Sequence, residues 1–207
     1  MNESGLADPP RAAPRSGARR SFLGRWLGAV RLDASVYEEV EHDRAAIFQA
    51  LGIVSVAGLA RGLAAVANDD LVGVSGSIVI ALTSWLIVTL LLWLVGVVID
   101  HDTSSFFELL RTVGFAASPL VFLVIVALPP LATPYIVLAV KVVTHAAAGV
   151  ALVVAAREAL DVSTRRSVVI CGVVIGVLAI VVANLLNALA LRLQSIMDVV
   201  VAAASQT

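Results

Sequence analysis

A long apolar stretch dominates the hydrophobic pattern of this chain. Residues 78–99 read IVIALTSWLIVTLLLWLVGVVI and include no charged side chain. An α-helix rises about 1.5 Å per residue, so the stretch spans about 33 Å, enough for a hydrocarbon core of about 30 Å. Its polar side chains are the hydroxyls of Thr83, Ser84 and Thr89, which are tolerated in lipid because they bond to the helix's own carbonyls. The pattern predicts a transmembrane helix.

Further apolar runs follow the same pattern, and together they contain more buried helix than a soluble chain of 207 residues could enclose. We therefore predict an all-α integral membrane protein with five transmembrane helices. The spans are expected at residues 45–67, 75–99, 113–131, 135–156 and 167–191. A disordered basic tail (1–20) and short juxtamembrane helices (21–44) are expected before them, and a short outer tail (192–207) after them.

Composition supports this class of protein. Hydrophobic residues make up 60% of the chain and charged residues 14%, and the mean hydropathy is +1.00. Soluble domains average about 45–50% apolar and about 25% charged residues. The formal net charge of −1 gives no reason to expect nucleic acid as a partner. The expected partners are the lipid bilayer and, as further candidates, other membrane proteins or the chain itself.

The segment before the first span consists of a basic tail followed by an amphipathic stretch. Residues 1–20 hold almost no large apolar side chain and are expected to be disordered. Arg19 and Arg20 resemble a twin-arginine export signal, but Arg25 and Arg31 interrupt the apolar region that such a signal needs. Apolar side chains at helical spacing then predict an amphipathic helix in the membrane interface. These side chains are Phe22, Leu23, Trp26, Leu27 and Val30.

Two Ser-x-x-Glu patterns predict where short helices begin. Ser35 with Glu38, and Ser105 with Glu108, fit capping boxes. Acidic residues crowd the end of the first of these helices, and we interpret them as a solvated helix face. They are Glu38, Glu39, Glu41 and Asp43.

The sequence Asp100-His101-Asp102 raises a metal hypothesis, because carboxylates and imidazole are common ligands. Adjacent side chains do not converge on one point as well as side chains four apart on a helix do. We therefore predict a polar turn, and expect neither a metal nor a cofactor.

Ionisable residues inside the predicted spans are the sharpest chemical feature. Lys141 and His145 lie four residues apart, so they share one face of the fourth helix. Such groups usually face a bundle interior or a watery cavity. A structural pair is the alternative, with a snorkelling lysine and a neutral histidine bonded to a neighbouring helix. Arg61 near the far end of the first span, and Asn184 and Asn187 in the fifth, complete a candidate polar cluster.

Small residues and prolines predict how the helices pack. Gly58 and Gly62, and likewise Gly172 and Gly176, are four apart and would let another helix approach closely. Pro119 is expected to kink or divide the third span. The single cysteine, Cys171, lies in an apolar run and is interpreted as a core side chain.

The positions of arginine and lysine predict the orientation. With the N-terminus in the cytoplasm, eleven of these residues fall on the cytoplasmic side and only Arg192 falls outside, while Arg61 and Lys141 lie within spans. The eleven are Arg11, Arg15, Arg19, Arg20, Arg25, Arg31, Arg44, Arg111, Arg157, Arg165 and Arg166. We expect a multi-pass protein of the cell membrane, with a cytoplasmic N-terminus and an outer C-terminus.

Three segments resemble the Yip domain family of Ypt/Rab-interacting proteins, most closely its bacterial branch. They are residues 106–119 (FFELLRTVGFAASP), 156–170 (AREALDVSTRRSVVI) and 32–50 (LDASVYEEVEHDRAAIFQA). The resemblance implies five spans and a cytoplasmic N-terminus. In the eukaryotic branch it also implies small GTPase binding, which reaches this chain only by analogy. The Asp-Leu-Tyr-Gly-Pro motif of that branch is not found here, and residues 32–37 are the candidate replacement.

The sequence supports two hypotheses about function. The first is a non-enzymatic membrane scaffold that organises lipids or partner proteins. The alternative is a small-solute or ion carrier or channel that uses Lys141 and His145. An intramembrane enzyme is not expected, because the HExxH and GxSxG motifs are missing and a Ser–Lys pair would need Ser84 or Ser118 beside Lys141.

Overall fold

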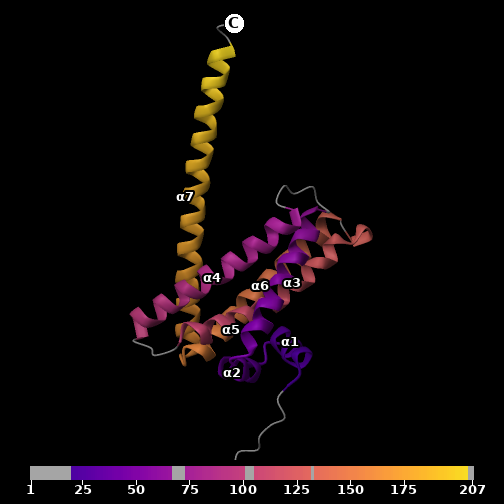
Figure 1. The fold of residues 1–207 in the computed structure, drawn as a ribbon, viewed down its shortest axis with the longest axis vertical. Coiled ribbons are helices and arrows are strands. Elements are labelled where there is room, and N and C mark those ends of the chain that lie inside the picture. Colours follow the sequence, from indigo (N-terminus) through magenta and orange to yellow (C-terminus); the bar gives the residue numbers. More distant parts are fainter. Residues whose placement is uncertain (1–19, 67–72, 101–104, 132, 205–207) are drawn as a thin grey trace, which may run out of the picture.

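The structure is a computed structural model that describes residues 20–66, 73–100, 105–131 and 133–204. The described residues form helices joined by short turns, and the two short N-terminal helices lie across one end of a bundle of longer ones (Figure 1). The helices are α1 (Phe22–Val30), α2 (Ala34–His42), α3 (Ala46–Val66), α4 (Gly73–Asp100), α5 (Phe106–Ala116), η1 (Ser118–Ala127), η2 (Pro129–Leu131), α6 (Pro134–Ala159) and α7 (Thr164–Ala204).

Five segments of the described chain are long and apolar enough to cross a membrane, which confirms the predicted fold class. They are Ala46–Val66, Gly73–Gly96, Phe106–Ala127, Pro134–Ala159 and Thr164–Gln194. Helix α3 is the centre of the bundle, because α4, α5 and η1 all pack against it. Since successive spans run in opposite directions, α3 begins, α6 ends and α7 begins at the end that carries α1 and α2.

A buried arginine fixes the two short helices to the bundle. Arg25 of α1 is only 1% exposed. Its Nη2 and Nη1 atoms lie 2.8 Å from the carboxylates of Glu39 and Asp43, and Nη1 also donates to Oε1 of Gln49 at 3.1 Å. Gln49 belongs to α3. One guanidinium therefore ties α1, α2 and the first turn of a spanning helix together.

This network corrects the interpretation of the acidic residues as a solvated face. Glu39 lies on α2 and Asp43 directly follows its last residue, and the carboxylates of both accept from Arg25. Burial works to lower the pKa of Arg25, but the hydrogen bonds and charges of Glu39 and Asp43 outweigh it and raise that pKa. Only Glu38 of the acidic group is fully exposed.

The start of α2 also differs from the prediction. Asp33, not Ser35, is the N-cap residue, and its carboxylate accepts from the backbone N–H of Ser35 at 3.1 Å. The second predicted capping box is confirmed. Ser105 caps α5, and the Glu108 side chain accepts from the Ser105 backbone N–H at 2.9 Å.

The third span consists of two kinds of helix. The α-helix ends at Ala116, and a 3₁₀-helix with Pro119 in its first turn continues to Ala127. The proline ring clashes with the carbonyl four residues back and has no N–H to donate, so the α-helical hydrogen bonds cannot continue. A 3₁₀-helix rises about 2.0 Å per residue, so its ten residues cover about 20 Å, against about 15 Å as α-helix.

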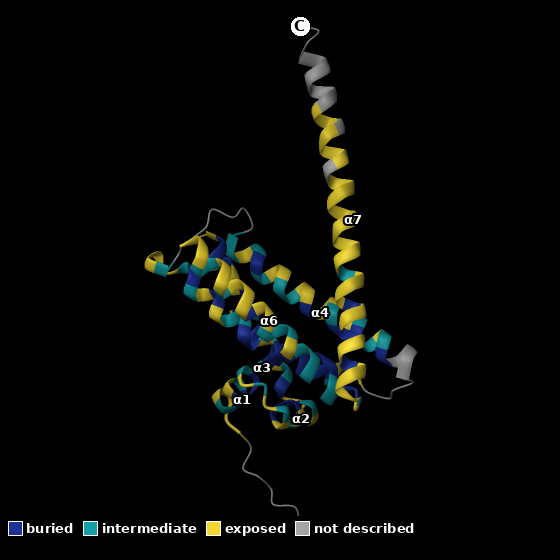
Figure 2. Ribbon diagram, turned by 180° about the vertical axis from the view of Figure 1, so that it is seen from behind, coloured by how far each residue is buried: buried dark blue, intermediate teal, exposed yellow. Residues whose placement is uncertain are grey.

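Helix α7 stands largely apart from the bundle (Figures 1 and 2). Among the α7 residues whose burial is described, the buried ones lie in the first turns, where Ile170, Cys171 and Val174 pack against the core. Cys171 is thus a core side chain, as predicted. The helix does not end near residue 191 but continues to Ala204, so its 41 residues extend about 60 Å. The segment predicted as a short outer tail is therefore mostly helical.

Other helix boundaries differ from the predicted ones by a few residues, and some predicted features fall on residues that the structure does not describe. The fourth and fifth spans begin and end beyond the predicted limits, so the charged loop between them shrinks to residues 160–163. Three predictions fall wholly or mostly outside the described residues: the disorder of residues 1–19, a short loop at residues 68–70 after the first predicted span, and the polar turn at residues 100–102. Of this turn the structure describes only Asp100, the last residue of α4.

Replacing Arg25 with methionine should destabilise the protein by about 3–5 kcal/mol, because two carboxylates lose the charge that compensates them. Unfolding of the purified protein in detergent would measure the loss. Arg31→Met is the matched control, since Arg31 is exposed just beyond the end of α1. Equal stabilities of the two variants would contradict this role of Arg25.

Candidate functional site: a basic cleft between the spanning helices

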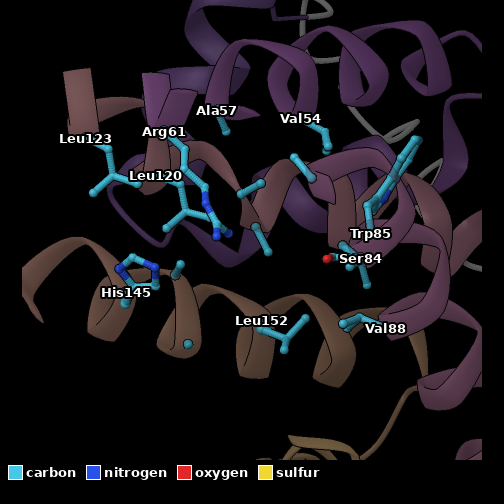
Figure 3. A pocket seen from close by; sticks show the side chains of 16 residues that line it. Val54, Ala57, Arg61, Ser84, Trp85, Val88, Leu120, Leu123, His145 and Leu152 are labelled. Atoms are coloured by element: carbon cyan, nitrogen blue, oxygen red, sulfur yellow. The ribbon is translucent and has the colours of Figure 1, made fainter. Parts of the chain in front are cut away.

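An apolar cavity with positive charge at one end lies between α6 and the helices α3, α4 and α5–η1 (Figure 3). Its volume is about 270 Å³. Most lining side chains are apolar. The polar ones are Arg61, Ser84 and His145, together with the indole of Trp85. The larger apolar side chains are Val54, Val88, Val113, Leu120, Leu123 and Leu152.

Arg61 and His145 face each other across this cavity. Arg61 reaches in from α3 and His145 from α6, and Figure 3 shows the guanidinium and the imidazole directed into the same space. Both residues also line a second cavity of about 230 Å³, in which Lys141 joins them. Since Leu123 lines both cavities as well, the two adjoin, and we call them together the basic cleft. Three residues of the predicted polar cluster thus come together.

The electrostatic character of the cleft is one-sided. Among the described residues, none that lines either cavity is acidic. Within the described chain, no carboxylate pairs with Arg61 or Lys141. The Nδ1 atom of His145 lies 2.8 Å from the carbonyl oxygen of Lys141, so the histidine bonds to its own helix and not to a neighbour. The cleft is therefore built to attract an anion.

The cations lie in the half of the bundle that is farther from α1 and α2. Arg61 is five residues before the end of α3, and Lys141 is seven residues after the start of α6. By helical rise, they lie about 8 Å and about 10 Å from those helix ends. His145 is one turn deeper, at about 16 Å.

The two asparagines of the predicted cluster lie elsewhere. Asn184 and Asn187 are on the exposed part of α7, and Asn184 Nδ2 donates to the Ile180 carbonyl of its own helix at 2.8 Å. Neither lines the basic cleft. Within a single chain they lie apart from Lys141 and His145, because α7 diverges from α6 before it reaches these positions.

The two glycine pairs behave differently. A Cβ atom at Gly62 would lie 2.6 Å from Cα of Val74, and one at Gly58 would lie 2.8 Å from Cα of Ile78. Both glycines therefore allow α3 and α4 to touch along their backbones. A Cβ at Gly172 or Gly176 would meet nothing within 4 Å. The prediction of close packing does not hold for this second pair within one chain.

The serines considered for catalysis do not join Lys141. Ser84 lines the larger cavity, which Lys141 does not reach, and Ser118 is fully buried at the start of η1. Among the described residues, no group of three or more histidine, cysteine, aspartate or glutamate side chains could hold a metal ion. The carrier hypothesis on Lys141 and His145 remains a hypothesis.

Two structural residues of the site were missed from the sequence. Trp85 closes one wall of the cleft, and its Nε1 donates to the Leu110 carbonyl of α5 at 2.9 Å. Gly114 makes this crossing possible, because a Cβ there would lie 2.5 Å from Cβ of Ala50 and 3.2 Å from the indole nitrogen. The tryptophan lies within a long, uncharged and mostly apolar run, so nothing in the sequence marked it as part of a site. A lone glycine in an amphipathic helix was the one available hint.

Glu41 of α2, which was expected on a solvated helix face, is partly buried. Partial burial raises the pKa of Glu41 to about 7, a shift that His42 opposes and the charges of Asp161 and Glu108 reinforce. Arg111 of α5 donates to the backbone carbonyl of Glu41, and its charge also favours the ionised carboxylate. Carboxylates from three segments thus converge near one arginine.

Comparison with known proteins gives one family match. The family model described as the Yip1 domain matches residues 35–185, which is most of the chain. No curated protein and no solved structure matches the chain.

Gly62→Ala should destabilise the protein by about 1–3 kcal/mol, because the new methyl group meets the backbone of Val74, which cannot move aside. Gly52→Ala is the matched control in the same helix: nothing lies within 4 Å of its Cβ, and alanine favours the helix by up to about 1 kcal/mol. Thermal unfolding in detergent would rank the two. Equal effects would mean that the contact between α3 and α4 is not tight.

Lowering the pH from 8 to 5 should stabilise the wild-type protein, in part through Glu41. Its raised pKa means that the native state holds the proton more tightly than the unfolded chain. The resulting stability is present below about 4.5 and is lost as the pH rises to about 7. Glu41→Gln should therefore be more stable than wild type at pH 8 and show a weaker pH dependence.

Melting temperatures at both pH values would check this prediction for Glu41. The exposed Glu38 on the same helix provides the control variant, Glu38→Gln. The raised pKa of His42 acts with the same sign, so some pH dependence should persist in Glu41→Gln. An unaltered pH dependence in Glu41→Gln would refute the assignment.

Proposed function

The chain belongs to the Yip1 domain family, and from this we propose that it is a non-enzymatic membrane scaffold. In this proposal, α1 and α2 form a platform that holds partner proteins or lipids next to the membrane. We use the term platform for α1 and α2 together.

The observation that carries the proposal is the rigid attachment of the platform. Arg25 joins it to Gln49 of α3, and α2 also packs against α5 and α6. Trp26 of α1 lies against Phe122 of η1, with ring centroids 6.1 Å apart, a separation typical of aromatic pairs. A surface that is fixed to several spans can hold a partner at a defined distance and angle from the bilayer.

The platform offers two different exposed surfaces. The first is apolar and includes Phe22, Leu23 and Leu27, all exposed on α1. An amphipathic helix with such a face is suited to the membrane interface. The second is polar and includes Glu38 and His42, exposed on α2. We assign the first surface to the bilayer and the second to a protein partner.

The orientation of the proposal follows from the arginines. Eleven of the fourteen lysine and arginine residues lie in the tail, the platform and the segments on the same side as the platform. The platform is accordingly assigned to the cytoplasmic side of the cell membrane, with the C-terminus outside. A small GTPase is one candidate partner, by analogy with eukaryotic members of the family.

Cysteine crosslinking in native membranes would test the scaffold role. The only cysteine, Cys171, is buried, so a Cys171→Ala background leaves an introduced cysteine as the single reactive site. Glu38→Cys should crosslink a distinct partner protein. Tyr135→Cys, 87% exposed at the start of α6 at the opposite end, is the control and should not capture that partner.

Two further readouts sharpen this experiment. Adding Arg25→Met should loosen the platform and abolish the Glu38→Cys adduct, while the protein still resists carbonate extraction. A membrane-impermeant maleimide should label Tyr135→Cys in intact cells but not Glu38→Cys. Identical adducts from the two positions would count against the scaffold, and labelling of both from outside would reject the orientation.

A further inference from the structure

We propose that the basic cleft binds a membrane lipid with an anionic headgroup. Arg61, Lys141 and His145 would hold the phosphate of the headgroup, and the apolar cavity beside them would hold an acyl chain. This site is distinct from the platform of α1 and α2, and it lies in the opposite half of the bundle.

Charge complementarity is the first reason. Arg61 and Lys141 lie within membrane-spanning helices, and within the described chain no carboxylate pairs with either. An uncompensated charge in a bilayer costs several kcal/mol, so such residues pair with an opposite charge or reach water. The arginine fork matches two oxygens of a phosphate, and the lysine adds a point charge. An anion that comes from the bilayer would satisfy both.

The imidazole of His145 suits the same ligand. Its Nδ1 lies 2.8 Å from the Lys141 carbonyl, and a carbonyl can only accept, so Nδ1 carries a proton. The Nε2 atom is the ring nitrogen left to contact a ligand, and the ring lines both cavities of the basic cleft.

The apolar part of the cleft is the second reason. Val54, Val88, Leu120 and Leu152 line it, and beyond the basic end Ser84 is its one hydroxyl. A water molecule needs two to four polar partners, which this part does not offer. An empty apolar cavity forfeits dispersion contacts along its wall. Hydrocarbon is the filling that satisfies this surface.

The order of charged and apolar parts along the membrane normal is the third reason. The cations lie about 8–16 Å from the helix ends on their side, whereas Trp85 and Leu152 lie about 18 Å and about 27 Å from those ends. From the helix ends inward, the basic side chains thus lie nearer the membrane surface, and the apolar part of the cavity lies nearer the bilayer centre. A phospholipid in the leaflet away from the platform has this same order of headgroup and chain.

The cleft is accessible from the side. Arg61 of α3, Ser84 of α4 and His145 of α6 line the cavity and are nevertheless exposed. Helix α6 is held by η1, α5, α2 and α7, and its side toward α4 forms one wall of the cleft. A lipid could therefore enter laterally from the bilayer without unfolding any helix.

The test uses the full-length protein in detergent micelles and native mass spectrometry of bound lipid. The probes are a phosphatidylglycerol, a phosphatidylcholine with the same acyl chains, and inorganic phosphate. Both lipids carry the phosphate, but the choline ammonium of phosphatidylcholine would bring a positive charge next to the basic side chains of the cleft. Wild type should therefore bind phosphatidylglycerol at least about tenfold more tightly than phosphatidylcholine. Inorganic phosphate should compete only weakly, because it leaves the apolar cavity unfilled.

Two kinds of variant separate headgroup from chain. The double variant Arg61→Gln/Lys141→Gln should bind both lipids equally. Gly149→Leu places a side chain in the apolar cavity, where a Cβ at Gly149 meets nothing within 4 Å. It should weaken binding of phosphatidylglycerol by at least about tenfold while the cations stay in place. Gly172→Leu is the matched control, because Gly172 is equally unobstructed but lies on α7 outside the cleft.

The outcomes are decisive in either direction. Equal binding of the two lipids by wild type would overturn the proposal, and so would equal effects of Gly149→Leu and Gly172→Leu. Competition by inorganic phosphate at the affinity of the lipid would replace the lipid with a free phosphate and also overturn it. If the double variant does not fold, Gly149→Leu still decides. Crosslinking at Glu38 is independent of all these results, so failure here leaves the scaffold proposal unaffected.

Discussion

The contact on which the arrangement of the helices depends is the buried guanidinium of Arg25. A charge that is 1% exposed is costly unless opposite charges and hydrogen bonds surround it, and Glu39, Asp43 and Gln49 supply them. These partners come from α2, from the turn after it and from α3. The charge is satisfied only when all these segments meet, so one side chain converts two short helices, which would be marginal alone, into a fixed part of the bundle.

Among the spanning helices, the backbone determines the shape. The glycines at positions 58 and 62 bring α3 and α4 into backbone contact, and Gly114 brings α5 against both. Pro119 then changes the third span from α-helix to 3₁₀-helix, which is thinner and longer per residue. Tight contact on one side of α3 and a slender segment on another leave space toward α6, and this space is the basic cleft.

The number, order and apolar character of the spans could be predicted from the sequence, because bilayer thickness imposes a length that local composition reveals. Arg61, Lys141 and His145 were grouped from the sequence only because each is an ionisable residue within a predicted span. That they line one cleft could not be predicted from their positions. The Arg25 network was misinterpreted, since an arginine between apolar residues and a row of carboxylates is also the pattern of a solvated surface. The 3₁₀ geometry after Pro119 and the continuation of α7 past residue 191 could not be predicted in the same way. Hydrophobic periodicity shows which face of a helix is apolar, but it does not show which helix type forms or where the helix ends.

The two groups of cations show how the same side chain can have opposite roles. Around Arg25, carboxylates from the chain itself balance the charge, the guanidinium is sealed from solvent, and nothing further can bind. Around Arg61, the chain provides two more basic side chains, an exposed edge and an adjoining apolar cavity, and no lining residue in the described part of the chain is acidic. Folding therefore completes the first group but leaves the second with an unbalanced positive charge in a medium that penalises it. A protein that retains such a group within its spans has to draw the missing negative charge from its surroundings, and the bilayer is the nearest source.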